Sequence, residues 1–178
     1  MAGTGRSGTT WLSRIICSQL SARVMFEPFH SRYVPQFREF HYFQYMRPEA
    51  DNERLHAYCR RVLSGRIRDR WIDREVDVIR PQFRIVKEIR MNLFLRWFSI
   101  RFPDVPLLFV VRHPCAVVAS RMQWGWGSDS DLASFLVQPA LVEDFLADKM
   151  DIIEGARTEA QKHALVWCIS NLVPLRQF

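Results

Sequence analysis

The sequence lacks any long apolar run: no stretch of its 178 residues approaches the roughly 18 consecutive apolar residues of a membrane-spanning helix. It also lacks internal repeats, low-complexity tracts and linkers rich in proline, glycine or serine, which predicts a single domain over residues 1–178. Charged and turn-forming residues begin at Gly5, so we expect no leader peptide. With 48% hydrophobic and 13% aromatic residues, the composition excludes an intrinsically disordered chain.

Cysteine is scarce, and its four residues are far apart in the sequence and form no Cys-x-x-Cys or Cys–His pattern. This spacing predicts neither a structural zinc site nor a redox pair. We expect buried free thiols in a reducing compartment. The cysteines are Cys17, Cys59, Cys115 and Cys168.

Lysine is also scarce, because only three of the 25 cationic residues are lysines, which leaves 22 arginines. The planar guanidinium group suits phosphate and sulfate, and the formal net charge of +6 favours an anionic partner. Codon bias would produce the same excess of arginine, so composition alone does not identify the partner. The sequence contains no recognised RNA- or DNA-binding motif, and we expect no nucleic-acid partner.

Short apolar runs alternate with helical patterns along the chain. Residues 22–29 and 84–89 predict strands, and the apolar run 107–111 is typical of a parallel strand buried on both faces. Helical patterns cover residues 12–20, 51–65, 92–102, 114–123, 139–154 and 158–172. The alternation predicts an α/β fold, and we expect three layers with a mostly parallel central sheet flanked by helices.

A glycine-rich turn lies at residues 3–10, Gly-Thr-Gly-Arg-Ser-Gly-Thr-Thr, and leads directly into a predicted helix. Gly3 and Gly8 have the spacing of the phosphate-loop pattern, in which inward-facing amides and a helix N-terminus hold an anion. Thr9 stands where a nucleotide hydrolase has lysine. Arg6 returns a cation to the loop itself, three positions earlier.

The run Arg6–Leu12, Arg-Ser-Gly-Thr-Thr-Trp-Leu, resembles the 5′-phosphosulfate loop of sulfotransferases that use 3′-phosphoadenosine 5′-phosphosulfate (PAPS), especially carbohydrate-type and bacterial members. The resemblance implies a P-loop-type fold, PAPS as the sulfuryl donor and PAP as the nucleotide product. It also implies that Trp11 packs beside the adenine. The donor-binding residues that it implies in this loop are Arg6, Ser7, Gly8, Thr9, Thr10 and Trp11.

A second segment, residues 110–121, supports the same interpretation. Arg112 ends the predicted strand 107–111, and Ser120 lies eight residues later in the next helix. Strand ends and helix N-termini meet at the carboxyl edge of a parallel sheet, where ligands bind in such folds. The pair resembles the 3′-phosphate motif of sulfotransferases. Arg121 is either a further phosphate contact or a solvated charge.

The acceptor of a sulfuryl group loses a proton, so a base is needed within hydrogen-bond reach. Glu27, in Phe26-Glu27-Pro28, resembles the proposed base of carbohydrate sulfotransferases, and its apolar neighbours predict a raised pKa. Alternatively, Glu27 caps a helix or pairs with an arginine. Glu88 is the second candidate base, and His30 and His113 are weaker ones.

Lys87, at the end of the predicted strand 84–89, matches the lysine that lies near the sulfuryl group in soluble sulfotransferases. Ile89 stands where those proteins have a catalytic histidine, which argues against a base of that type. In a regular strand Lys87 and Glu88 point to opposite faces, so only one of them faces the site.

The mechanism implied by the resemblance is in-line transfer of a sulfuryl group to a hydroxyl or amine of a small-molecule or carbohydrate acceptor, with catalytic roles for Arg6, Glu27, Lys87 and Glu88. We expect no metal. The arginine-rich stretch 60–74 either binds an anionic acceptor or forms a solvated face. Trp124 and Trp126 either stack on a ligand or anchor their loop.

Two other functions remain open: a P-loop kinase or other phosphotransferase, and an inactive fragment that binds PAP. The resemblance predicts that the chain lacks part of the first strand and a C-terminal strand and loop. We expect a cytoplasmic location, with a Golgi-lumenal catalytic fragment without its membrane anchor as the alternative. The sequence leaves the oligomeric state open.

Overall fold

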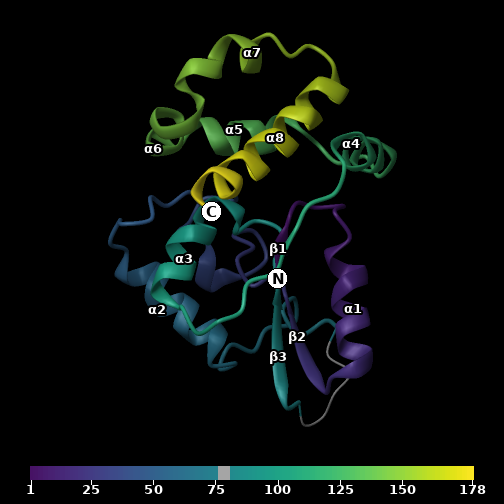
Figure 1. Ribbon diagram of the computed structural model, residues 1–178, viewed down its shortest axis with the longest axis vertical. Coiled ribbons are helices and arrows are strands. Elements are labelled where there is room, and N and C mark those ends of the chain that lie inside the picture. Colours follow the sequence, from purple (N-terminus) through teal and green to yellow (C-terminus); the bar gives the residue numbers. More distant parts are fainter. Residues whose placement is uncertain (76–80) are drawn as a thin grey trace.

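The protein is described here by a computed structural model that covers residues 1–75 and 81–178. It is an α/β protein whose short strands lie between helices (Figure 1). The strands are β1 (Ala2–Gly3), β2 (Ala22–Phe26), β3 (Phe83–Lys87) and β4 (Phe109–Val110). The helices are α1 (Thr9–Gln19), α2 (Glu53–Leu63), α3 (Leu95–Arg101), α4 (Pro114–Gln123), α5 (Asp129–Leu136), α6 (Pro139–Leu141), α7 (Met150–Glu154) and α8 (Glu159–Gln177).

The described strands form two parallel pairs, β2 with β3 and β1 with β4. A single parallel bridge between Ala2 and Glu88 connects the pairs. On the two sides of β1, the Glu88 amide donates to the Met1 carbonyl (3.0 Å) and the Ala2 amide donates to the Leu108 carbonyl (2.8 Å). The strands therefore lie side by side in the order β2-β3-β1-β4, and their carboxyl ends share one edge.

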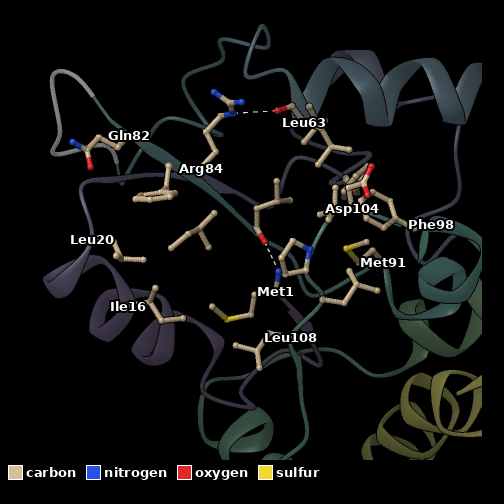
Figure 2. Close-up of a pocket in the computed structure, with 18 residues that line it drawn as sticks. Met1, Ile16, Leu20, Leu63, Gln82, Arg84, Met91, Phe98, Asp104 and Leu108 are labelled. Atoms are coloured by element: carbon tan, nitrogen blue, oxygen red, sulfur yellow. Dashed lines mark hydrogen bonds between the residues drawn. The ribbon is translucent and has the colours of Figure 1, made fainter. Parts of the chain in front are cut away.

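The predicted buried strand 107–111 is wrong in two respects. Only Phe109 and Val110 are in β4, and Leu108 and Val111 are 43% and 46% exposed. Leu108 lines a cavity of about 580 Å³ beside β3 and residues 105–108, and Met1 lies among the residues that surround it (Figure 2). Leu107 and Leu108 line this open space, whereas Phe109 packs against a cluster of buried apolar residues.

The predicted helix bounds agree better with the structure near the glycine-rich turn than towards the C-terminus. Pro114 begins α4 in the first turn, as predicted. The helix predicted over residues 51–65 is α2, and Asn52 caps it, because the Asn52 side chain accepts from the Leu55 amide. The predicted single helix 139–154 is instead α6, a π turn, a 3₁₀ turn and α7 in succession. The sequence analysis missed α5.

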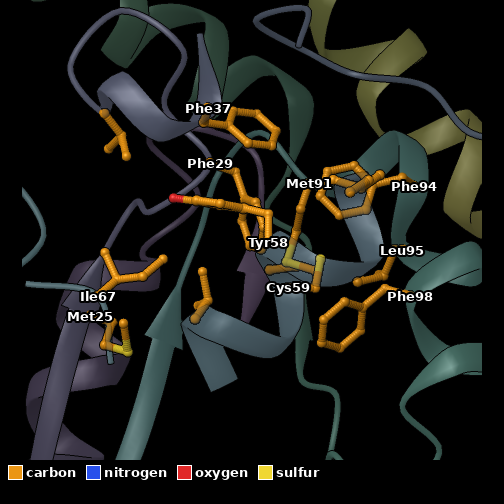
Figure 3. Packing of buried hydrophobic residues seen from close by; sticks show 14 of the residues in the cluster. Met25, Phe29, Phe37, Tyr58, Cys59, Ile67, Met91, Phe94, Leu95 and Phe98 are labelled. Carbon is orange, nitrogen blue, oxygen red and sulfur yellow. The ribbon is translucent and has the colours of Figure 1, made fainter. Parts of the chain in front are cut away.

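An aromatic cluster packs α2 and α3 against the segment that follows β2 (Figure 3). Phe29 makes edge-to-face contacts with Phe37, Tyr58 and Phe94, with ring centroids 5.3 to 5.8 Å apart. The Tyr58 hydroxyl also donates to the Pro28 carbonyl at 2.6 Å. Aromatic pairs add about 0.5–1.5 kcal/mol each beyond burial. The cluster therefore fixes the backbone on the C-terminal side of Glu27.

A second cluster of buried apolar residues lies under α5 and α8, including Leu93, Phe135 and Val166. The Thr158 hydroxyl and the Gln161 side chain cap the start of α8 reciprocally. Within residues 1–75 and 81–178, no helix has the length and apolar character needed to cross a membrane.

Candidate functional site

The glycine-rich turn connects β1 to α1 at the carboxyl edge of the strands. Gly8 has φ 98° and Arg6 has φ 72°, so both residues adopt the left-handed region. A side chain at Gly3 would lie 2.7 Å from the Val110 carbonyl, so only glycine lets the turn pass this close to β4. The first amides of α1 have no acceptor within the helix, and they carry partial positive charge. The turn therefore has the chemistry of an anion cradle.

The two motifs meet at this turn. Arg6 Nε donates to Ser120 Oγ at 2.9 Å, and Arg112 Nη1 donates to the Arg6 carbonyl at 3.1 Å. The Trp124 ring lies 5.0 Å from the Arg6 guanidinium. Residues 112–124 thus contact Arg6, which lies more than a hundred positions earlier in the chain.

A cavity of about 390 Å³ lies over the turn, and we call it the loop cavity. The sequence-predicted residues that line it are Arg6, Gly8, Thr9, Thr10, Glu27, Lys87 and Arg112. Arg74 and Trp126, which were not assigned to the donor site, line it as well. Its wall is predominantly basic, which suits an anionic ligand.

Three predicted donor-binding residues do not line the loop cavity. Ser7 is buried, its amide donates to the Thr4 carbonyl, and its hydroxyl lies 2.9 Å from the position that a Gly3 Cβ would take. Its side chain therefore points under the turn. Trp11 is 69% exposed on the first turn of α1. Ser120 acts on the cavity only through Arg6.

Glu27 follows β2 directly and is buried in a cluster of charges. Its carboxylate accepts from Lys87 Nζ at 2.7 Å and from Arg90 Nη1 at 2.6 Å. Its backbone is left-handed, with φ 45°. Burial pushes the pKa of Glu27 up, but Arg90 and Lys87 outweigh it and hold the pKa below its ordinary value. The expected rise in this pKa is thus wrong, because the neighbours of Glu27 include two cations.

Glu88, the second candidate base, is fully buried on the opposite face of β3 from Lys87, as the strand alternation predicts. It accepts from the amides of Phe29 (2.8 Å), Ile89 (2.8 Å) and Arg90 (3.0 Å). Burial raises its pKa. Glu88 does not line the loop cavity, and its carboxylate instead ties the segment after β2 to the segment after β3. Its catalytic role stays a prediction.

The two histidines named as weaker bases differ in environment. His30 is buried beside Arg90, and burial together with that charge lowers its pKa to about 3. A neutral imidazole with so low a pKa is a poor proton acceptor. His113 is exposed at the start of α4 and makes no side-chain cap there.

Arg121 is neither a phosphate contact nor a solvated charge. It is 3% exposed, pairs with Asp131 and donates to His163 Nδ1 at 3.0 Å. Trp126 packs directly on Gly5, where a Cβ would collide with its ring. The sequence analysis missed Arg90, because it follows β3 outside the strand alternation. The arginine count was the only signal for it.

The fold and site define an α/β protein with a glycine-rich turn at a helix N-terminus that faces a basic cavity. In the described part of the chain, no group of three or more His, Cys, Asp or Glu side chains is placed to hold a metal ion. No family model matches the chain, and no curated protein or solved structure is similar to it.

Proposed function

We propose that this chain is a PAPS-dependent sulfotransferase that transfers a sulfuryl group to a hydroxyl or amine of an acceptor. The observation that carries the proposal is the hydrogen bond from Arg6 to Ser120, together with that from Arg112 to the Arg6 carbonyl. The two segments that separately resemble the 5′-phosphosulfate loop and the 3′-phosphate motif are in direct contact. A chance match of either segment gives no reason for that contact.

The residues of the loop cavity suit a donor with an anionic group at each end. PAPS supplies the sulfuryl group and the PAP leaving group. Arg6 and the amides of residues 8–10 are the donors for the phosphosulfate, and Arg112 is the donor for the 3′-phosphate. The space over Gly8 supports this fit, because nothing lies within 4 Å of a Cβ built there. Trp11 remains our candidate for stacking on the adenine.

Glu27 is the residue that we assign to the acceptor proton. Its lowered pKa keeps it ionised at neutral pH, so it can accept a hydrogen bond from an acceptor hydroxyl. The same lowered pKa makes Glu27 a weak base. The proton of the acceptor hydroxyl therefore moves to Glu27 late in the transfer, after the acceptor oxygen has begun to bond to sulfur. Lys87, 2.7 Å from Glu27, adds positive charge beside the sulfuryl oxygens.

The proposal includes a three-layer P-loop-type fold. The order β2-β3-β1-β4, with every described pair parallel, supports it. So does the placement of α1 on one side of the strands and of α2 and α3 on the other (Figure 1). The glycine-rich turn and Glu27 both lie at the carboxyl ends of the strands. Ligands bind at that edge in parallel sheets of this kind.

The test measures PAP binding by isothermal titration calorimetry for the wild type and for Ser120→Ala and Arg112→Ala. We expect each substitution to weaken binding at least about tenfold, since hydrogen bonds to charged groups contribute roughly 1.5–3 kcal/mol. Ser18→Ala and Arg157→Ala, at exposed positions in α1 and before α8, are the matched controls. Absence of PAP binding by the folded wild type would overturn the proposal.

Transfer is measured separately, with radiolabelled PAPS and a panel of sugars, phenols and amines. PAP binding without transfer to any acceptor would leave the inactive PAP-binding alternative and overturn the catalytic claim. Magnesium-dependent ATP binding that exceeds PAP binding would favour the phosphotransferase alternative, which lacks the loop lysine because Thr9 stands there.

A further inference from the structure

Trp167, in α8, is hydrogen-bonded to the segment that carries Arg112. Its indole Nε1 donates to the Arg112 carbonyl at 3.1 Å, although the two residues are 55 positions apart in the sequence. The Trp167 ring is half-buried, and α8 lies beside α4, which begins just after this segment (Figure 1). The sequence analysis assigned no role to this tryptophan.

The segment between β4 and α4 is short and exposed. Residues 111–113 belong to neither element, and all three are exposed. Backbone of this kind is restrained by the particular contacts that it makes and not by a strand or helix. The carbonyl of Arg112 and the amide of His113 lie in one peptide plane. The bond from Trp167 therefore fixes the peptide unit that joins these two residues.

Two further hydrogen bonds connect this peptide unit to the glycine-rich turn. Arg112 Nη1 donates to the Arg6 carbonyl at 3.1 Å, and Arg6 Nε donates to Ser120 Oγ at 2.9 Å. The two arginines are therefore held in the same way, since each accepts a side-chain hydrogen bond at its backbone carbonyl. Arg112 holds Arg6, and Trp167 holds Arg112. Trp167 is thus the first residue of a series of three bonds that ends at Ser120.

Trp167 itself lies outside the loop cavity and is not one of the residues that line it. It lines a different cavity, of about 10 Å³, together with Thr4 and Gly5 of the glycine-rich turn. A space of this size holds one water molecule at most, so it admits no nucleotide. An effect of Trp167 on nucleotide binding must therefore pass through the backbone of Arg112.

A second contact holds the other end of α4 on α8. Arg121, in the last turn of α4, donates from Nε to His163 Nδ1 at 3.0 Å. His163 lies four positions before Trp167, so both side chains are on the same side of α8. Because the contact with His163 orients α4 separately, loss of the Trp167 N–H group should release Arg112 and leave Ser120 in place.

We propose that Trp167 is a positioning residue for Arg112, and that it acts by holding the Arg112 carbonyl. The inference rests on the proposed function, in which Arg112 binds the 3′-phosphate of the donor. With the bond in place, the Arg112 side chain starts from one backbone position beside the turn. Without the bond, the peptide unit adopts several positions, and only a fraction of the molecules can bind the phosphate. The apparent dissociation constant rises as that fraction falls.

The first measurement is the ¹⁵N order parameter of the His113 amide, obtained by NMR relaxation of the full chain without ligand. This amide belongs to the peptide unit that accepts the bond from Trp167. We expect a value of about 0.85 in the wild type, which is typical of rigid backbone, and a clearly lower value in Trp167→Phe. Trp97→Phe is the matched control, because Trp97 Nε1 also donates to a backbone carbonyl, that of Ala50, at 2.7 Å. It should leave the His113 value unchanged.

The second measurement is calorimetric titration of the same three proteins with PAP. Trp167→Phe should weaken PAP binding about three- to tenfold, as expected for the loss of one neutral hydrogen bond, and Trp97→Phe should not change it. In the Arg112→Ala background, Trp167→Phe should cause no further loss, because the position of residue 112 then no longer matters. A variant with 3-benzothienylalanine at position 167 repeats both measurements, since its ring has nearly the size of indole and has sulfur in place of the N–H group.

Three results would overturn the inference while PAP binding by the wild type stands. They are an unchanged His113 order parameter in both variants at position 167, equal PAP affinity of these variants and the wild type, and equal losses from Trp167→Phe with and without the Arg112 side chain. Absence of PAP binding by the folded wild type overturns the proposed function instead. The His113 order parameter, which is measured without nucleotide, then decides separately whether Trp167 holds this peptide unit.

Discussion

Arg6 and Ser120, 114 positions apart in the sequence, are joined by a 2.9 Å hydrogen bond from Nε to Oγ. The bond uses one edge of the guanidinium, and the Trp124 ring supports one of its faces. Arg6 also lines the loop cavity. Ser120 is therefore a positioning residue, which orients a cation before any ligand arrives.

The first prediction is that Ser120 affects PAP binding only through its hydrogen bond with Arg6. Ser120→Ala should weaken PAP binding by releasing Arg6, and Arg6→Met should weaken it more. Because Ser120 acts through Arg6, the double variant should bind PAP no more weakly than Arg6→Met alone. Calorimetric titration of the four proteins gives the coupling free energy, which we expect to be about 1–2 kcal/mol. Losses that simply add would show that Ser120 contacts the ligand independently.

The second prediction separates two arginines that flank α4. Arg112 is exposed at the cavity, so Arg112→Ala should weaken PAP binding with little change in the free energy of unfolding. Arg121 is buried with Asp131, so Arg121→Met should lower the free energy of unfolding by about 3–5 kcal/mol, because it strands a buried carboxylate. Urea unfolding and PAP titration of both variants check this. If Arg121→Met were as stable as the wild type, its pairing with Asp131 would contribute nothing.

Local patterns predicted the elements around the site because each has a short-range cause. Gly3 and Gly8 define the turn, Pro114 begins α4, and the β-branched residues Ile85 and Val86 lie in β3. The alternation of Lys87 and Glu88 across the strand also follows from local geometry. These features depend on a few adjacent residues, and the sequence contains them all.

The environment of Glu27 was not predictable in the same way. Its sequence neighbours Phe26 and Pro28 are apolar, but its partners Lys87 and Arg90 come from sixty positions away. A pKa depends on the charges that are near in space. The residues next to Glu27 in the sequence therefore predict the wrong direction for the shift of its pKa. The contact of Arg6 with Ser120 is long-range too, and the sequence analysis paired Ser120 with Arg112 and not with Arg6.

The third prediction concerns the buried cluster around Glu27. Glu27→Ala leaves Lys87 buried without a counter-charge and Arg90 with only the more distant Glu88 carboxylate, at 3.9 Å, and it should lower the free energy of unfolding by about 3–5 kcal/mol. Lys87→Met should cost less than half of this, because Arg90 still neutralises Glu27. Urea unfolding at neutral pH measures both. Equal costs would mean that Lys87, not Arg90, is the principal partner of Glu27.

The fourth prediction is a pH dependence from His30, whose folded pKa is lowered to about 3 from an ordinary 6.5. The unfolded chain therefore binds more protons between these values, and stability falls as pH decreases below 6.5. The loss is about 1.4 kcal/mol per pH unit, or about 2 kcal/mol between pH 7 and pH 5. In His30→Gln this component should disappear. Burial, Arg90 and Arg32 lower this pKa, and Glu27 opposes them.

Urea unfolding of the wild type and His30→Gln at pH 7, 6 and 5 isolates the contribution. His163, whose pKa is also lowered, is present in both proteins and cancels in the difference. Glu27 titrates below this range because its pKa is lowered from 4.5. Parallel stability curves for the two proteins would show that His30 is not buried in its neutral form.

The fifth prediction tests the contact between Gly5 and Trp126. A methyl group at Gly5 would collide with the Trp126 ring and lie 3.3 Å from Ile89 Cδ1, so Gly5→Ala must displace the indole from the wall of the loop cavity. We expect a loss of about 1–3 kcal/mol in the free energy of unfolding and a red shift of the tryptophan fluorescence. Gly127→Ala is the matched control, because its nearest atom would be 4.0 Å away. Adding Trp126→Leu to Gly5→Ala should recover stability, since the smaller side chain leaves room for the methyl group. If the double variant were less stable than Gly5→Ala, the cost would arise in the backbone of the turn and not at Trp126.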